Sequence, residues 1–159
     1  MSPGQLEALL RYRLDQAHET LHEAEILLDE NALRGAINRS YYAMFYTLVA
    51  LLATKQLGTS KHSGALSLFD REFVKTGLFA LDLSRSLRLA FNLRQTLDYG
   101  EMTQIDQPTV EQTLAEAKLF VEAIETYLYS TGYLTPRKQI NRPMNRVLQV
   151  RLWPVAGPA

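Results

Sequence analysis

Residues 36–53, which read AINRSYYAMFYTLVALLA, decide the fold class of this protein. At about 100° per residue on a helix, one side of this stretch carries only large apolar and aromatic side chains. These are Ile37, Tyr41, Met44, Leu48, Leu51 and Leu52. The other side carries one charge, two phenols and two small residues: Arg39, Tyr42, Ala43, Tyr46 and Ala50. A helix covered on both sides is predicted to lie inside a group of helices, with its second side against another helix or lining a cleft.

The rest of residues 1–132 shows the same three- and four-residue spacing of apolar side chains, and each run ends at a helix stop. Helix starts are predicted at Ser2-Pro3, Asn31, Ser60, Asp82 and Pro108. The second helix is predicted to run to about residue 56. Glycines mark the later helix ends, at positions 58, 77, 100 and 132. The sequence therefore predicts an all-α, antiparallel up-and-down bundle of about five helices.

The composition limits the class of protein. The chain has 159 residues, of which 47% are hydrophobic and none is cysteine. This excludes a disordered chain, a disulfide scaffold and a metal site that needs thiolates. The longest nearly apolar stretch, residues 41–53, is shorter than the ~20 residues of a membrane-spanning helix, and the first residues lack the features of a secretion signal. We therefore expect a soluble, cytoplasmic protein that does not enter a membrane.

The net charge of zero conceals two regions of opposite sign. After Glu125, the last acidic residue, come five basic ones: Arg137, Lys138, Arg142, Arg146 and Arg151. Because the whole chain is neutral, the residues before this tail carry a net charge of −5. We predict a helical bundle over 1–132 and a basic tail over 133–159, in which residues 147–153 have the pattern of a short strand. The tail is expected to lie on its own acidic bundle, on a second copy or on a partner's sheet edge.

The second side of the central helix is a candidate binding surface. Arg39, Tyr42 and Tyr46 fit an anion or nucleotide site, because a guanidinium group matches the geometry of phosphate and phenols orient or stack ligands. A structural interpretation remains open: a buried arginine satisfied by carbonyl groups or a carboxylate, with the tyrosines packed around it.

The fourth predicted helix adds a second arginine. Arg94 and Asp98 are four residues apart on the apolar face of this helix, and Tyr99 follows them. Either they form an ion pair that clamps the bundle, or they contribute to a site, because buried charges are normally paired. His62 opens the third helix beside Lys61, where an imidazole titrates near neutrality.

No metal or cofactor is predicted. His18 and His22 lie one turn apart, which is a possible geometry for two metal ligands, but the sequence places no third ligand with them. A polar flank of the first helix explains this spacing better. The chain also lacks a glycine-rich phosphate loop, a nucleophile elbow and a zincin motif.

Three blocks of sequence resemble the prokaryotic members of the HEPN-domain family (higher eukaryotes and prokaryotes nucleotide-binding). The blocks are residues 39–45 (RSYYAMF), residues 61–64 (KHSG) and residues 94–99, which begin with arginine and end in Asp-Tyr. The resemblance implies a helical bundle that forms a homodimer and is often encoded beside a minimal nucleotidyltransferase, as a toxin–antitoxin or defence module. It also implies RNA or a nucleotide as ligand. Many members are metal-independent ribonucleases whose site, at the dimer cleft, uses an arginine followed by four to six residues and a histidine.

The chain departs from that pattern at position 46, where the histidine counted from Arg39 is replaced by Tyr46. A phenol with a pKa of ~10 is poorly suited to proton transfer near pH 7. Either His62 supplies the proton transfer from a neighbouring loop, or the protein keeps a binding cleft without cleaving RNA. The candidate catalytic residues are Arg39, Tyr46 and His62, and the candidate RNA- or nucleotide-binding residues are Arg39, Tyr42, Arg94, Asp98 and Tyr99.

Two functions follow from the resemblance. The first is a homodimer that binds RNA or a nucleotide in a cleft around Arg39 and, in its catalytic version, cleaves RNA without a metal. The alternative is a non-catalytic partner subunit of a minimal nucleotidyltransferase, which contributes a surface and a tyrosine that the partner modifies.

Overall fold

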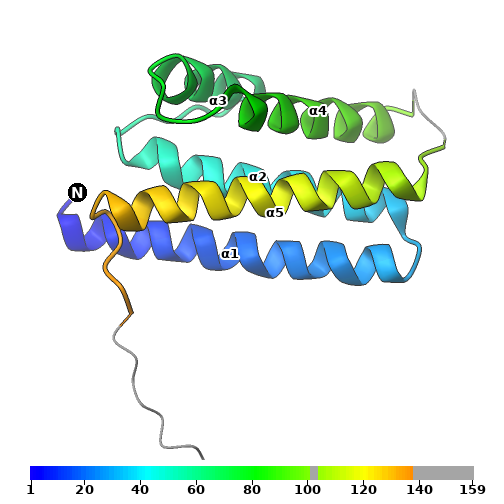
Figure 1. Ribbon diagram of the computed structural model, residues 1–159, viewed down its shortest axis with the longest axis horizontal. Helices are drawn as coiled ribbons and strands as arrows, with labels where there is room; N and C mark the ends of the chain where they lie inside the picture. The colour runs from blue at the N-terminus through cyan, green and yellow to red at the C-terminus, as the bar shows by residue number, and fades with distance from the viewer. Residues whose placement is uncertain (101–103, 138–159) are drawn as a thin grey trace, which may run out of the picture.

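The computed structural model describes residues 1–100 and 104–137, and every regular element in these ranges is helical. The α-helices are α1 (Pro3–Asp29), α2 (Leu33–Ala53), α3 (His62–Phe69), α4 (Leu81–Asp98) and α5 (Gln107–Ser130), and the π-helical turn η1 (Asp70–Val74) extends α3 (Figure 1). The predicted all-α bundle is confirmed. Among the described residues, no helix has both the length and the apolar character needed to span a bilayer.

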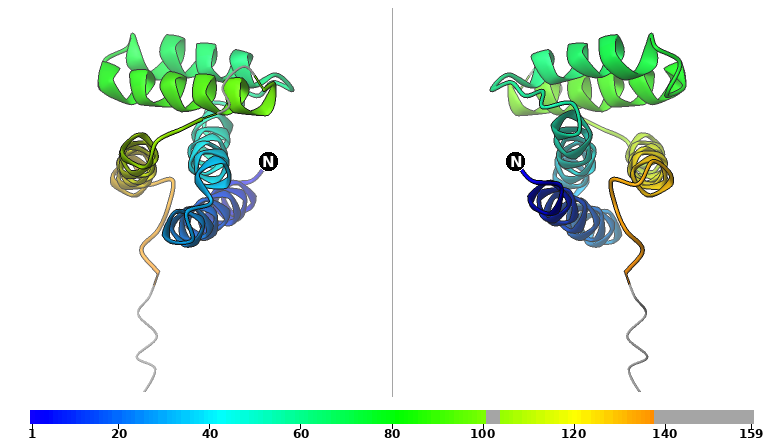
Figure 2. Two further views of the ribbon diagram at one scale, coloured as in Figure 1. Left: turned by 90° about the vertical axis from the view of Figure 1, so that its right-hand side faces the viewer. Right: turned by 90° about the vertical axis from the view of Figure 1, so that its left-hand side faces the viewer.

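The helices form two groups with α2 between them. In Figures 1 and 2, α1, α2 and α5 run alongside one another, and α3 and α4 lie together across the far side of α2. α2 packs against each of the other α-helices. The end of α5 lies beside the start of α1, so these two helices are antiparallel neighbours. The centre of the bundle is therefore the helix that the sequence marks as apolar on one side and mixed on the other.

Other helices cover the apolar side of α2 fully and its second side in part, where Arg39 keeps 29% of its side chain exposed. On the apolar side, Tyr41 and Met44 have no exposed surface. On the opposite side, Ala43 and Ala50 are fully buried and Tyr42 is half-buried. Burial of one large apolar side chain contributes about 1.5–3 kcal/mol to the free energy of unfolding. The repeated burial along α2 therefore makes this helix the main source of core stability.

Side chains and turns define the ends of the helices. α1 begins with a capping box, in which Ser2 Oγ accepts a hydrogen bond from the Gln5 backbone N–H at 3.2 Å and Gln5 Oε1 accepts one from the Ser2 backbone N–H at 2.8 Å. α5 begins with Asp106, whose carboxylate accepts from the Thr109 backbone N–H at 2.9 Å. The glycines at the predicted ends 77, 100 and 132 have positive φ angles, as helix-terminating glycines do.

Two predicted helix caps are wrong. Asn31 does not cap α2 but ends α1 in the left-handed region, with φ 58°, and α2 begins two residues later without a side-chain cap. Asp82 lies in the first turn of α4, where the helix dipole favours a carboxylate, and the cap position is occupied by Ala80. α2 ends at Ala53, before the predicted Gln56, which itself has φ 55°.

The residues after α5 pack onto the bundle. Leu134 is 1% exposed and joins the core. Glu7 accepts hydrogen bonds from the Thr135 backbone N–H at 3.0 Å and from the Thr135 hydroxyl at 2.7 Å. Arg137 pairs with Asp15 at 3.0 Å. The tail thus begins along α1, and the predicted strand at residues 147–153 lies outside the described residues.

Replacing Glu7 with glutamine is expected to reduce stability at neutral pH. Its hydrogen bonds to Thr135 and Arg11 lower the pKa of Glu7 from its usual value of 4.5 to about 2. A lowered folded-state pKa contributes stability above pH 4.5 that is lost as the pH falls toward 2. Thermal unfolding at pH 7 and pH 3 should show a lower midpoint for Glu7→Gln at pH 7 and a smaller difference from wild type at pH 3.

The matched control for this prediction is Glu19→Gln, an exposed glutamate on the same helix. An equal loss of stability in the two variants, or an equal loss at both pH values, would contradict a stabilising role for the Glu7–Thr135 contact.

Candidate functional site

Aromatic residues of α2 hold His62, the first residue of α3. The Tyr41 hydroxyl oxygen lies 2.7 Å from His62 Nδ1. The Phe45 ring stacks on the imidazole, with 4.1 Å between the ring centroids and 3° between the planes. Tyr41 and Phe45 are four residues apart and therefore lie on one side of α2. This contact joins the middle of the central helix to the start of α3.

The protonation states of this pair follow from burial. Burial raises the pKa of the Tyr41 hydroxyl above its usual value of 10, so Tyr41 remains a neutral phenol. Burial and the nearby Arg94 guanidinium lower the pKa of His62 below its usual 6.5, so His62 is neutral at pH 7. A buried hydroxyl without an acceptor costs about 1–3 kcal/mol. The Tyr41 O–H therefore donates to Nδ1, which leaves the imidazole proton on Nε2.

Arg94 of α4 lies over the same rings. Its guanidinium carbon is 5.0 Å from the Tyr41 ring centroid and 5.6 Å from that of Tyr42. Asp98 accepts a hydrogen bond from Arg94 Nη1 at 3.0 Å. The Arg94 side chain is 16% exposed, and its Nε atom is buried without a hydrogen-bond partner among the described residues. The aromatic faces thus take the place of a hydrogen-bonding partner on one side of the guanidinium group.

A second guanidinium lies against Tyr42. The Arg39 guanidinium carbon is 5.2 Å from the Tyr42 ring centroid, and Arg39 donates to the Asn38 side-chain oxygen at 2.8 Å. Glu23 of α1 lies 3.7 Å away, a loose ion pair between half-exposed side chains. The Tyr46 ring is next to Tyr42, with 5.9 Å between the centroids. Two cations and two phenols therefore gather on the second side of α2.

The structure brings together most of the residues proposed from the sequence. Arg39, Tyr46 and Arg94 all lie against Tyr42, and His62 meets its edge with 5.8 Å between the ring centroids. Asp98 belongs to the group through Arg94. Tyr99 differs, because it lies beyond the end of α4, is 78% exposed and has no described aromatic or cation contact with the group.

Sequence reasoning missed the roles of Tyr41, Phe45 and Phe91. It placed Tyr41 in the core, which is correct, but it did not identify the hydroxyl contact with His62. Phe91 lies 5.9 Å from the Arg94 guanidinium carbon and completes the aromatic surroundings of this cation. The predicted burial of Tyr41 could have indicated this contact, because a hydroxyl group in the core requires a hydrogen-bond partner.

The described metal-binding candidates do not form a site. His18 is paired with Glu125 at 2.7 Å, and His22 lies 3.8 Å from Glu25. Among the described residues, no group of three or more histidine, aspartate or glutamate side chains is arranged to hold a metal ion.

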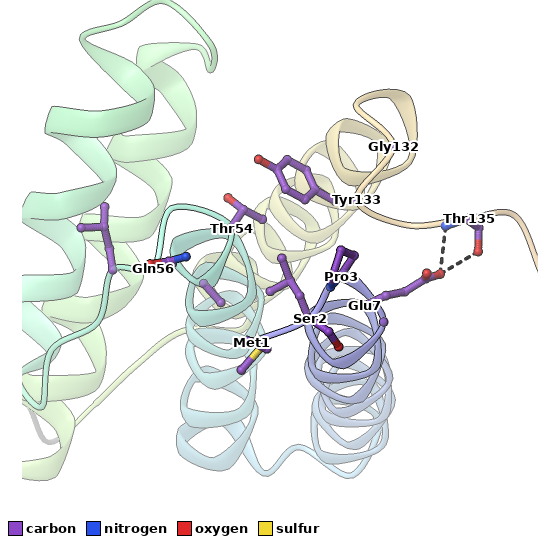
Figure 3. A pocket seen from close by; sticks show the side chains of 13 residues that line it. Met1, Ser2, Pro3, Glu7, Thr54, Gln56, Gly132, Tyr133 and Thr135 are labelled. Atoms are coloured by element: carbon purple, nitrogen blue, oxygen red, sulfur yellow. Dashed lines mark hydrogen bonds between the residues drawn. The ribbon is translucent and has the colours of Figure 1, made fainter.

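A hollow of about 720 Å³ lies elsewhere, at the end of the bundle where both ends of the described chain meet (Figure 3). It is lined by the start of α1, by the residues at the end of α2 such as Thr54, and by Tyr133 and Thr135. None of the residues grouped around Tyr42 lines it.

Comparison with known proteins identifies the family. The model of the HEPN domain matches residues 10–127, so this chain belongs to the HEPN domain family. It is 42% identical over 119 residues to a protein named "UPF0332 protein" from Thermotoga maritima, which covers 75% of this chain and 90% of that protein. It is 34% identical over 131 residues to a protein of Methanocaldococcus jannaschii named "Putative toxin", with 79% of this chain and 89% of that protein covered. A second protein of that name from the same organism is 36% identical over 118 residues, with 72% and 85% covered.

Replacing Tyr41 with phenylalanine is expected to release the imidazole of His62. In the wild-type protein, ¹⁵N NMR should show His62 protonated on Nε2, with a pKa below 6.5. In Tyr41→Phe, the hydrogen bond that favours the neutral imidazole is removed, so the pKa should rise and both tautomers should become populated.

Tyr46→Phe is the matched control, because it removes the same hydroxyl from the same helix at a residue without a described contact to His62. It should leave the His62 signals unchanged. A wild-type His62 protonated on Nδ1 would show that the imidazole donates this hydrogen bond and that the Tyr41 hydroxyl oxygen accepts it.

Proposed function

We propose that this protein binds RNA as a homodimer, on the surface formed by Arg39, Tyr42, His62 and Arg94. We further propose that it is the toxin-like member of a module with a minimal nucleotidyltransferase. The observation that carries the proposal is the presence of two guanidinium groups, 5.2 and 5.6 Å from the centroid of one half-buried tyrosine ring. The two relatives named as toxins support the second part.

Each group on this surface matches a part of RNA. Arginine forks bind phosphate oxygens in two-point contacts. Exposed faces of tyrosine rings stack on bases, at about 1–3 kcal/mol per base. The Nε2–H group of a neutral His62 is a further hydrogen-bond donor for a phosphate or a ribose oxygen. Because the chain before the tail carries a net charge of −5, attraction to RNA must come from local cations of this kind.

The geometry favours binding over cleavage. Metal-independent cleavage needs a proton acceptor at the ribose hydroxyl, and the lone pair of His62 that faces Tyr41 is already engaged. The other nitrogen of the ring carries the proton. Tyr46, at the position of the family's histidine, is a phenol and a poor acceptor near pH 7. The groups of this site therefore hold an anion without an obvious route for proton transfer.

The family resemblance and the partial exposure of this surface support the homodimer. Arg39 retains 29% exposure of its side chain, and Tyr42 and Tyr46 are half-buried within one chain. A second copy placed against this side of α2 would bring two such groups together and extend the RNA-binding surface across the dimer.

Arg39→Ala should weaken binding of a short single-stranded RNA about tenfold or more, since a hydrogen bond to a charged group contributes about 1.5–3 kcal/mol. It should also lower the slope of log K against log[salt] by about 0.7 for each phosphate that the arginine neutralises. Fluorescence anisotropy over a salt series measures both quantities.

Arg85→Ala is the matched control, because it removes the same charge from the exposed face of α4. Equal binding by wild type and Arg39→Ala, or equal weakening by both variants, would contradict the proposed surface. Cleavage of the RNA in the presence of EDTA, abolished by His62→Ala, would show that the site is catalytic and that binding alone is too narrow a description.

The alternative function, a non-catalytic partner subunit of a nucleotidyltransferase, is favoured by a different residue. Tyr99 is 78% exposed beside Asp98 at the end of α4, where a partner enzyme can reach its hydroxyl. Co-expression with a nucleotidyltransferase encoded beside this gene tests the association. Co-purification together with undetectable RNA binding would favour this alternative.

A further inference from the structure

Two hollows between α1 and α5 form a groove, which is lined by side chains of both helices. Figure 2 shows α1 on the side of the bundle away from α3 and α4. The first hollow, of about 260 Å³, is bordered by Asp15, and the second, of about 430 Å³, by Glu25 and Glu122. Both hollows are lined by His18 of α1 and Glu125 of α5, whose side chains meet at 2.7 Å, so this pair lies between the two hollows.

The chain itself enters this groove at one end. Leu134 and Arg137 line the first hollow, and Arg137 Nη2 lies 3.0 and 3.1 Å from the two carboxylate oxygens of Asp15. Thr135 contacts Glu7, which lies nearer to the start of α1 than Asp15 does. Thr135 and Arg137 thus contact α1 at two positions that are eight residues apart, and Arg137 makes the contact nearer to the second hollow.

The charges of the groove complement those of the chain that follows. Glu25 is paired with Lys118 at 2.6 Å, whereas Glu122 has no ion pair within the described residues. Among the described residues, Lys118 is the one lysine or arginine that lines the second hollow, against three glutamates. Residues 138–159 contain four basic residues and no acidic one. The second hollow is therefore acidic, and the residues that follow Arg137 in the sequence are basic.

The spacing of the acidic residues on α1 also matches the spacing of the basic residues in the tail. Asp15 and Glu25 are ten residues apart on α1, which corresponds to about 15 Å at 1.5 Å per residue. Arg137 and Arg142 are five residues apart, which corresponds to about 17 Å for an extended chain. With Arg137 on Asp15, Arg142 can therefore reach Glu25 and Glu122.

We propose that residues 138–146 of the same chain occupy the groove between α1 and α5, with Arg142 at Glu25 and Glu122. The basic segment then lies between α1 and α5, at hollows that none of Arg39, Tyr42, His62 and Arg94 lines. The RNA-binding surface of one chain then acts without its own tail, and the tail stabilises the bundle through contacts that weaken with salt.

Disulfide trapping tests this directly, because the chain has no cysteine of its own. His22 lines the second hollow, and Asn141 precedes Arg142, so the pair His22→Cys with Asn141→Cys introduces two thiols and keeps every charged residue proposed to pair. The matched control combines Asn141→Cys with Tyr12→Cys, a position on α1 that is 62% exposed and lies on the other side of Asp15 from the second hollow. Melting curves of the reduced proteins confirm that both variants fold.

Under mild oxidation, we expect a disulfide within one chain to form at least about tenfold faster in the His22 pair than in the Tyr12 pair, because docking raises the effective thiol concentration. The rate should fall as NaCl rises from about 50 mM to about 500 mM, because salt screens the ion pairs. Similar rates in the two pairs would overturn the proposal. A disulfide formed only between two chains would overturn it too, since the occupant would then be the tail of a second copy. Because the trapping reaction contains no RNA, failure of this proposal and failure of the proposed function are distinguishable.

Discussion

The hydroxyl group of Tyr41 is a polar group in the middle of the central helix. Much of the site depends on the hydrogen bond that this hydroxyl makes. Tyr41 has no exposed surface, and its hydroxyl oxygen lies 2.7 Å from His62 Nδ1. Burial keeps the phenol neutral by raising its pKa. The hydrogen bond therefore positions the first residue of α3 over α2 and determines which ring nitrogen of His62 faces away from the core.

Two cations lie around Tyr42, the next residue of the same helix. Arg94 of α4 and Arg39 of α2 both lie against the Tyr42 ring. Glu23 pairs with Arg39 and Asp98 pairs with Arg94, which partly neutralises the two positive charges. The net charge of the bundle opposes general attraction to nucleic acid, so the proposed affinity for RNA arises from this local group. The apparent neutrality of the chain results from a separate feature, the basic tail, whose first contacts are with Glu7 and Asp15 of α1.

Much of the fold followed from the sequence, because helical periodicity and glycine stops are local signals. The all-α class, the central position of α2 and the glycine stop at Gly132 just after α5 could all be predicted. The helix caps near Asn31 and Asp82 could not be predicted correctly. Each of these two residue types is favourable at more than one position near a helix end, so the sequence did not distinguish the cap from its neighbours. Grouping of Arg39, Tyr42 and Arg94 was suggested by family resemblance. The Tyr41–His62 hydrogen bond was not predicted. It joins two residues that are 21 positions apart on different helices, and helical periodicity indicates only contacts within one helix.

The central claim is that RNA contacts the Tyr42 side of α2. Titration of the ¹⁵N-labelled protein with a short single-stranded RNA, followed by NMR chemical shifts, tests it most directly. We predict that the largest changes occur at the Arg39 and Arg94 side-chain N–H groups and at His62 Nε2, with little change along the groove between α1 and α5. Changes concentrated in that groove or in residues 138–159, with the Arg39 and Arg94 signals unmoved, would contradict it.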